Sequence, residues 1–290
     1  MIPEVNQLIE RFDELGYVVE EELATVLYLM LKLNKPLLLE GPPGVGKTEA
    51  ANIIAAFQGH ELIRLQCYEG LDVNTSVYEW NYQKQLLSIK LSEKEGISSE
   101  AKEHQIFSES FLLKRPLLKA ITSEKPVVLL IDEIDRADEE FEAFLLELLS
   151  DFQISIPELG TIKAIHKPIV VLTSNRTREL SDALKRRCLY HWVDFPDFDK
   201  EMAIVQKHVS VEAHILHQLV KFVAYLRDQK LQKLPGIAET IDWANALIAL
   251  NAHVLSEEMV TATLGCILKS QSDIDFIKSS LKGILSEVNR

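Results

Sequence analysis

The pattern of apolar and polar positions divides the chain into a first part of alternating strands and helices and a second part of helices alone. Apolar residues recur at helical spacing over positions 4–15, which Gly16 ends, and over positions 20–33. Helices are also expected at 48–57 and from Asp138 onward. Strands that alternate with helices are typical of an α/β domain. Short apolar runs predict the strands at 36–40, 61–67, 127–131, 168–173 and 189–195.

One stretch between the second and third predicted strands lacks a clean period. Residues 68–82 are rich in aromatic and polar groups, and Tyr78, Trp80 and Tyr82 alternate as in a half-buried strand. The alternation favours packing of these rings, although an exposed contact surface is the alternative. We therefore expect an excursion from the main domain at this point.

Three further segments complete the first part of the chain. Residues 83–106 are predicted to be helical, and 107–122 to form one helix or two short ones with a kink near Pro116. A β-hairpin is expected at 153–163, because isoleucines alternate on one arm and a glycine lies near the turn. Residues 178–187 are predicted to form a helix that ends in basic residues.

From Asp199 onward the pattern is helical throughout. Pro235-Gly236 separates the second of these helices from the third. We therefore predict a domain boundary between residues 195 and 196, with domains at 1–195 and 196–290. The helical spans expected in the second domain are 199–208, 211–228, 240–252, 256–270 and 273–288.

Composition narrows the class of protein. The chain has 290 residues, of which 47% are hydrophobic and 26% charged, as in soluble globular proteins. A formal net charge of −13 argues against a nucleic-acid-binding surface as the main function, because phosphate contacts need clustered Lys and Arg. Cys67, Cys188 and Cys266 form no C-x-x-C pair, which favours reduced thiols over zinc or disulfides. No signal peptide or membrane span is visible, so a cytoplasmic location is expected.

The turn after the first predicted strand fits the phosphate-binding loop pattern G-x-x-x-x-G-K-S/T in full. A strand precedes it and a helix follows, so its amide groups and the helix N-terminus are expected to face phosphate oxygens. Lys47 is expected to reach the β- and γ-phosphates, and the Thr48 hydroxyl to bind Mg²⁺. The candidate nucleotide-binding residues are Gly41, Pro42, Pro43, Gly44, Val45, Gly46, Lys47, Thr48 and Glu49.

Two carboxylates follow the apolar run 127–131, as in a Walker B segment. Asp132 is expected to hold Mg²⁺, and Glu133 to polarise the attacking water. For Asp135 and Arg136, a surface ion pair and a role in the site are equally open.

Polar residues after the next strand are a second source of candidates. Asn175 is suited to contact the γ-phosphate and the water, although an Asx-type turn is the alternative. Arg186 and Arg187 are either cations at a helix C-terminus or an arginine finger that completes a neighbour's site.

In this order the motifs resemble those of the AAA+ ATPases, and more closely the MoxR family. The runs at 67–72, 78–82 and 156–160 look closest to its branch associated with carbon monoxide dehydrogenase maturation. The resemblance implies an α/β P-loop AAA+ core with a five-stranded parallel sheet, a helix-two insert at 68–90 and a hairpin before the sensor-one strand at 153–163. It also implies that 1–195 is the nucleotide-binding core and 196–290 a small all-helical lid domain.

The family roles transfer to individual residues. Lys47 and Thr48 resemble Walker A, Asp132 and Glu133 Walker B, and Asn175 sensor one. Arg187 resembles the arginine finger, with Arg186 as the competing choice.

One motif of the family is missing. Residues 235–243 stand where family members often carry a sensor-two arginine, and no Arg is present there. Either Lys233 substitutes for it, or hydrolysis depends more on the arginine finger of a neighbouring subunit.

The resemblance also implies an activity and partners. It implies an ATP hydrolase that uses ATP and Mg²⁺ as a homo-oligomeric ring, a hexamer, and remodels clients like a chaperone. The implied client is a metalloenzyme or other complex under assembly, and the implied partner a von Willebrand A-domain protein. The rival classes are a nucleic-acid-associated loader or motor and a small-molecule kinase. A GTP switch is disfavoured because no N-K-x-D run is present.

Overall fold

The structure is a computed structural model that describes residues 2–92 and 106–288. The chain divides into two compact units. One comprises Glu22–Glu40 and Thr48–Trp192, and the other Met1–Glu21, Gly41–Lys47 and Val193–Arg290. The predicted boundary between residues 195 and 196 stays a prediction.

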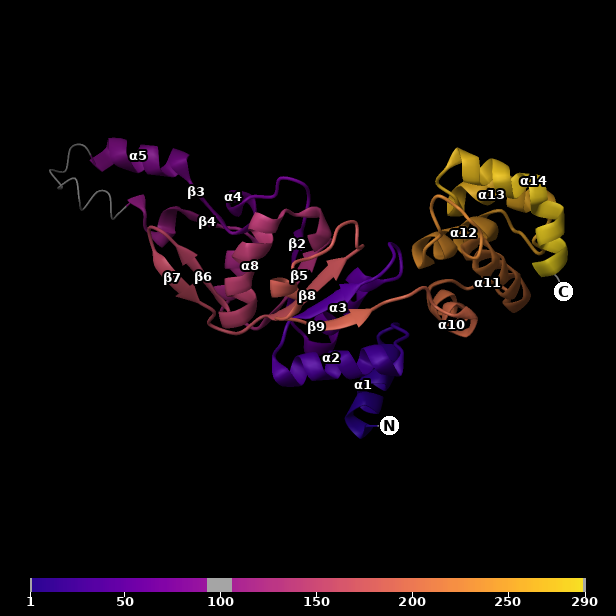
Figure 1. Cartoon of the computed structure of the whole chain (residues 1–290), viewed down its shortest axis with the longest axis horizontal. Coiled ribbons are helices and arrows are strands. Elements are labelled where there is room, and N and C mark those ends of the chain that lie inside the picture. The colour runs from indigo at the N-terminus through magenta and orange to yellow at the C-terminus, as the bar shows by residue number, and fades with distance from the viewer. Residues whose placement is uncertain (1, 93–105, 289–290) are drawn as a thin grey trace. The chain divides into compact units, whose positions relative to one another are not determined.

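A five-stranded sheet in the order β2-β5-β8-β1-β9 forms the centre of the first unit. All of its pairings are parallel, as the alternation of strands and helices predicted. Every residue of β5 is buried, because helices cover both faces of a parallel sheet. The strands are β1 (Leu37–Glu40), β2 (Glu61–Gln66), β5 (Val127–Asp132), β8 (Ile169–Ser174) and β9 (Leu189–Trp192) (Figure 1). The last strand is shorter than predicted, since it ends before residues 193–195.

Helices α7 (Pro116–Ile121) and α8 (Glu139–Asp151) contribute much of the apolar core beside β2, β5 and β8. Helix α8 begins where predicted, because the Asp138 side chain accepts a hydrogen bond from the Phe141 amide. Helices α2 (Glu21–Leu33) and α3 (Lys47–Gln58) also lie where the periodicity placed them. A kink in a longer helix is not observed near Pro116, which instead starts α7 at the position where proline is tolerated.

The excursion contains α4 (Val73–Ser76), β3 (Tyr78–Trp80), α5 (Tyr82–Ser92), the 3₁₀ turn η1 (Glu109–Phe111) and β4 (Leu112–Lys114). Strands β3 and β4 pair antiparallel, so the prediction of only helices at 107–122 is wrong. The strand at 112–114 was hidden because its partner lies more than thirty positions earlier in the chain. Tyr82 does not continue the alternation of Tyr78 and Trp80, because it begins α5. The part of the predicted helix 83–106 that falls on 93–105 lies outside the described residues.

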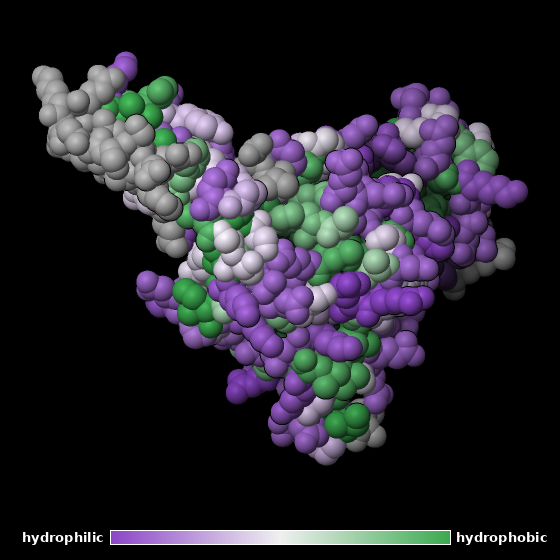
Figure 2. Space-filling view, turned by 60° about the vertical axis from the view of Figure 1, so that its left-hand side comes forward, coloured by the Kyte–Doolittle hydropathy of each residue, from purple (hydrophilic) through white to green (hydrophobic). Residues whose placement is uncertain are grey.

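Helix α5 places a polar side chain inside and apolar side chains outside. Gln85 is 5% exposed, and its amide donates to the Ile106 carbonyl oxygen at 2.7 Å. Leu86, Leu87 and Leu91 are exposed, and Figure 2 shows apolar atoms at this surface beside the atoms drawn in grey. The helix therefore reverses the usual burial of a surface helix.

The predicted hairpin is present as β6 (Gln153–Ile156) and β7 (Gly160–Lys163). The predicted helix 178–187 is wrong in its first half, because only α9 (Asp182–Lys185) is helical. Arg178 bonds to the Ala137 carbonyl and forms an ion pair with Glu142. The Ser181 amide donates to Glu142 as well, so these contacts hold the chain outside a helix until Ser181 caps α9.

Between residues 197 and 288, the second unit contains five helices, close to the predicted spans. They are α10 (Phe198–His208), α11 (Ala213–Arg227), α12 (Ile237–Ala249), α13 (Glu257–Ile267) and α14 (Gln271–Val288) (Figure 1). Their apolar faces form one core, in which the buried Trp243 donates to Thr263 at 2.8 Å. Helix α1 (Pro3–Glu14) belongs to the same unit, and Lys207 pairs with Asp13 at its end. Among the helices that the structure describes, none is long and apolar enough to cross a membrane.

Candidate functional site

The phosphate loop leads directly into helix α3. Gly44 and Gly46 have φ of 79° and 92°, the left-handed region that glycine adopts without strain. Lys47 begins α3 and is 6% exposed. Its Nζ donates to the carbonyl oxygens of Gly41 at 2.7 Å and Pro42 at 2.6 Å. The ammonium group is therefore held against the loop backbone, in a region that presents both amide groups and a cation to an anion.

Close backbone approaches fix this loop within its unit. A Cβ on Gly41 would lie 2.0 Å from the Val193 carbonyl oxygen, so no larger residue fits there. A Cβ on Gly236 would lie 2.8 Å from the Cα of Gly44. The Ile237 amide at the start of α12 donates to the Gly44 carbonyl at 2.9 Å. The run that lacks a sensor-two arginine therefore packs on the loop through Gly236, which the sequence did not identify.

Arg227 supports that approach from α11. Its Nε donates to the Pro235 carbonyl at 2.9 Å, and its two terminal nitrogens reach Glu201 at 2.5 and 2.8 Å. The guanidinium also lies 4.7 Å from the centre of the Phe195 ring. Arg227 thus ties the segment before α12 to α10 and α11. These contacts of Arg227 could not be predicted from the sequence, because their partners Pro235 and Glu201 lie on other segments of the fold.

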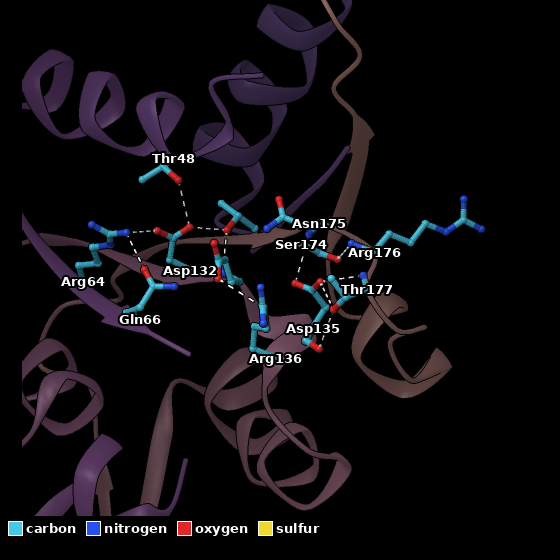
Figure 3. A network of polar contacts seen from close by, with 12 residues as sticks. Thr48, Arg64, Gln66, Asp132, Asp135, Arg136, Ser174, Asn175, Arg176 and Thr177 are labelled. Carbon is cyan, nitrogen blue, oxygen red and sulfur yellow. Dashed lines mark hydrogen bonds and ion pairs between the residues drawn. The ribbon is translucent and has the colours of Figure 1, made fainter. Parts of the chain in front are cut away.

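Asp132 lies at the carboxyl end of β5, and its side chain is 3% exposed. Its Oδ1 accepts hydrogen bonds from the hydroxyls of Thr48 at 3.0 Å and Thr173 at 2.5 Å. Its Oδ2 accepts from Nη2 of Arg64 at 2.5 Å, and Figure 3 shows Arg64 and Thr48 approaching Asp132 from different sides. The two residues predicted to bind magnesium are therefore in contact, although 84 positions separate them in the chain.

Thr173 connects Asp132 with the neighbouring Glu133. The Glu133 amide donates to the Thr173 hydroxyl at 2.9 Å, and that hydroxyl donates to Asp132. Glu133 has a left-handed φ of 54°, which turns the chain sharply at the end of β5. Its carboxylate is 38% exposed and lies 3.7 Å from Arg136. Thr173 was not predicted, and the only signal for it was a hydroxyl directly after the apolar run 169–172.

Asp135 is a buried member of this region, so the surface ion pair that the sequence left open for it is wrong. It is 3% exposed, and its carboxylate accepts from the amides of Asn175 at 3.1 Å and Thr177 at 2.9 Å and from the Thr177 hydroxyl at 2.7 Å. Burial alone would raise the pKa of Asp135, but these hydrogen bonds outweigh it and hold the pKa below its ordinary value. Asp135 therefore fixes the backbone that carries Asn175, whose side chain points toward the Asp132 side of the network (Figure 3). For Arg136, the ion pair is the one with Glu133.

The two candidate finger residues differ in their surroundings. Nε of Arg187 donates to the Ser150 hydroxyl at 2.6 Å, and Nη1 to the Ala183 carbonyl at 2.8 Å. The Arg186 side chain is exposed and makes no hydrogen bond or ion pair within residues 2–92 and 106–288. Within the same ranges, neither arginine contacts the Asp132 network.

Two of the three cysteines, Cys67 and Cys188, are unsuited to nucleophilic chemistry. Burial, followed by the negative charges of the neighbouring carboxylates, raises the pKa of Cys67 to about 12. Burial likewise raises the pKa of Cys188 to about 12. Both thiols are therefore neutral at physiological pH.

The residues at the sheet edge fit a magnesium ion. Mg²⁺ prefers oxygen ligands and commonly uses one or two protein groups together with substrate phosphates. Here a hydroxyl oxygen of Thr48 and a carboxylate oxygen of Asp132 lie 3.0 Å apart, next to the helix that follows the phosphate loop. The exposed Glu133 carboxylate adds a candidate base beside them.

Comparison with known proteins agrees with this arrangement. Residues 37–193, more than half of the chain, match the family model described as "ATPase family associated with various cellular activities (AAA)". "Uncharacterized protein SAB1265c" of Staphylococcus aureus is 30% identical over 216 residues, which cover 70% of this chain and 72% of that protein. "Uncharacterized protein SH1500" of Staphylococcus haemolyticus is 29% identical over 265 residues, 87% of this chain and 92% of that protein.

Two solved structures, both mutants of RuvB from Thermotoga maritima, share the fold. Their TM-scores are 0.52 and 0.53, at 21% and 20% sequence identity. The alignments cover 88% and 94% of this chain and 71% and 78% of those chains. The predicted fold class, an α/β AAA+ P-loop core with a five-stranded parallel sheet, is confirmed.

Proposed function

The chain belongs to the ATPase family associated with various cellular activities, and from this premise we propose that it is a Mg-ATP-dependent ring ATPase that remodels protein clients. Membership of this family makes the protein an ATP hydrolase. The observation that carries the proposal is the 3.0 Å contact between Thr48 and Asp132, which joins the helix after the phosphate loop to the strand end that also bears Glu133. The finer assignment is to the MoxR family, in the branch associated with carbon monoxide dehydrogenase maturation.

Each residue of the site has a proposed role in hydrolysis. The loop amides and Lys47 bind the phosphates, and Thr48 and Asp132 hold the metal. A bound Mg²⁺ supplies charge neutralisation at the β- and γ-phosphates. Glu133 orients the attacking water and accepts its proton, and the side-chain amide of Asn175 donates to the γ-phosphate.

The Glu133→Gln variant tests the catalytic assignment. It keeps the size and hydrogen bonding of the side chain but removes the base, so ATP turnover should fall about a hundredfold or more while nucleotide binding is retained. Glu139→Gln, an equal change on the exposed first turn of α8, is the matched control and should leave turnover unchanged. Unchanged turnover in Glu133→Gln would mean that another group is the base.

A second chain completes the site in this proposal, through Arg187 or Arg186. Each variant, Arg187→Ala and Arg186→Ala, is mixed with Glu133→Gln at equal concentrations, and ATP turnover is compared with that of the separate variants. If the arginine acts across an interface, about a quarter of the sites in a randomly mixed ring regain both residues and turnover reappears. The bonds of Arg187 to Ser150 and Ala183 mean that it must leave them to reach a neighbour, whereas Arg186 need not. The variant that is both inactive alone and rescued by mixing identifies the finger.

The client is proposed to be a metalloenzyme or other protein complex under assembly, with a von Willebrand A-domain protein as partner. The exposed leucines of α5 support a protein client, because apolar side chains on an excursion from the core offer a contact surface. The test is a pull-down with Glu133→Gln held in ATP, followed by mass spectrometry of the retained proteins. The matched bait carries Leu86→Ser and Leu87→Ser as well, and a true client should be lost from it. A hexameric ring and a cytoplasmic location remain predictions.

Two other classes make different predictions for the same assays. A small-molecule kinase releases no free phosphate without an added acceptor, whereas this protein should do so. A nucleic-acid motor is stimulated by DNA or RNA, whereas a chain with a net charge of −13 should turn over ATP at the same rate with either. Strong stimulation by nucleic acid would overturn the remodelling proposal without touching the ATPase assignment.

A further inference from the structure

Arg64 makes a contact with Asp132 that the proposed hydrolysis does not use. Strands β2 and β5 pair in parallel with Gln66 opposite Asp132, and Arg64 lies two residues earlier on β2. Residues two apart on a strand share a face, so the long side chain of Arg64 runs beside Gln66 toward the strand end. Its Nη2 donates to Oδ2 of Asp132 at 2.5 Å and to Oε1 of Gln66 at 2.6 Å (Figure 3).

The two partners of this ion pair have opposite exposure. The Asp132 side chain is 3% exposed, whereas that of Arg64 is 52% exposed. A buried carboxylate without a compensating charge is costly, and the two hydroxyls at Oδ1 are neutral donors. Arg64 thus supplies positive charge at Oδ2, and its solvent-exposed side chain is able to move away without any change in the core.

We propose that Arg64 is an internal counter-cation that competes with Mg²⁺ at Asp132 and thereby sets the Mg²⁺ concentration that nucleotide binding requires. The inference rests on the role of Asp132 proposed above. Both cations are attracted to the same carboxylate, and each repels the other across a few ångströms of partly buried protein. In this arrangement Arg64 is a positioning residue. It orients the Asp132 carboxylate without metal and opposes the metal when it arrives.

Removing the charge of Arg64 should therefore strengthen Mg²⁺ binding. In Arg64→Gln, the Mg²⁺ concentration for half-maximal nucleotide binding should fall on the order of tenfold. Without metal, the same variant should have a lower melting temperature than the wild type, because Asp132 has lost its counter-charge, and Mg²⁺ with ADP should raise that temperature by more than in the wild type. A residue that merely orients Asp132 would act in the opposite direction, since its loss would raise the Mg²⁺ requirement.

The experiment titrates MgCl₂ into the full-length protein with a fixed concentration of fluorescent N-methylanthraniloyl-ADP, after removal of metal with EDTA. Arg64→Lys keeps the charge and should stay within about twofold of the wild type. Lys119→Gln is the matched control. It removes a cation whose Nζ lies 2.7 Å from the carboxylate of Glu61, a residue of β2 like Arg64 but away from Asp132. If Arg64→Gln does not fold, Arg64→Met, which keeps the aliphatic stem, takes its place.

The outcomes separate this inference from the proposed function. If nucleotide binding by the wild type is independent of Mg²⁺, or if Asp132→Asn leaves the Mg²⁺ requirement unchanged, the proposed role of Asp132 is wrong. If Asp132→Asn raises the requirement while the neutral Arg64 variants leave it unchanged or raise it, only the inference about Arg64 is wrong. A lower requirement in the neutral variants, with Arg64→Lys and Lys119→Gln near the wild type, supports it.

Discussion

Two regions of the molecule depart from the rule that polar groups face water, and they do so in opposite ways. One is the region at the ends of strands β5 and β8, and the other is helix α5. Asp132, at the end of β5, and Asp135, three residues later, are nearly inaccessible carboxylates, and each accepts several hydrogen bonds. On α5, Gln85 is buried while Leu86 and Leu87 are exposed. The first region has its geometry determined by internal partners, as a reaction centre requires. The second leaves apolar surface in water, as a contact surface for another protein does.

The largest effect that tests this contrast is expected from Asp135→Asn. The new amide nitrogen cannot accept the hydrogen bonds of Thr177, so the free energy of unfolding should fall by about 1–3 kcal/mol. Urea denaturation at pH 7 measures it, and Asp151→Asn, an equal change at an exposed position at the end of α8, should change it by less than about 0.5 kcal/mol. Equal effects of the two substitutions would mean that the buried network does not stabilise the fold.

The difference in unfolding free energy between the wild type and Asp135→Asn should also depend on pH. The pKa of Asp135 is lower in the folded protein than its ordinary value of 3.8, so the folded state favours the ionised form. The resulting stabilisation is fully present above pH 3.8 and is lost as the pH falls through the folded-state pKa. The difference in unfolding free energy between wild type and Asp135→Asn should therefore be constant near neutrality and shrink in acid. A difference that grows as the pH falls would contradict the direction of the shift.

A smaller effect on stability, but a clear one on activity, is expected from Thr173→Val. Valine keeps the shape but removes the hydroxyl that links Asp132 to the Glu133 amide. We expect kcat for ATP hydrolysis to fall about tenfold, because both acidic residues lose part of their orientation. Thr173→Ser, which keeps the hydroxyl, should retain most of the activity. If valine and serine behave alike, the hydroxyl does not position the site.

The smallest effects on the unfolding free energy are expected on α5. There, replacing leucine by a polar residue should cost less than replacing glutamine by leucine. Leu86→Ser with Leu87→Ser should alter the unfolding free energy by no more than about 0.5 kcal/mol, because both side chains are already in water. Gln85→Leu should cost about 1 kcal/mol, since the Ile106 carbonyl loses its donor. Hydrogen exchange of the α5 amides measures both. Greater loss of protection in the double serine variant would show that the leucines pack within the chain.

Local patterns predicted much of this protein. Elements whose pattern depends on neighbours a few positions away could be predicted. They are strand β5 from its apolar run, helices α10 to α14 from their spacing, and strand β6 from its alternation. Strand β4 was missed because it is defined by pairing with β3. The first half of the predicted helix 178–187 failed for a similar reason, since Arg178 bonds to Ala137 and Glu142 from a distant segment.

The candidate site divides in the same way. The phosphate loop, the pair Asp132–Glu133 and the class of fold were predictable from the sequence alone, because loop chemistry and strand ends follow from local composition. The contacts of Arg64 and Thr173 with Asp132, the burial of Asp135 and the packing of Gly236 on Gly44 became known only from the folded structure. A hydrogen bond or a close backbone approach depends on positions in space, and residues from separate strands or helices reach those positions only when the sheet and the helical core have formed.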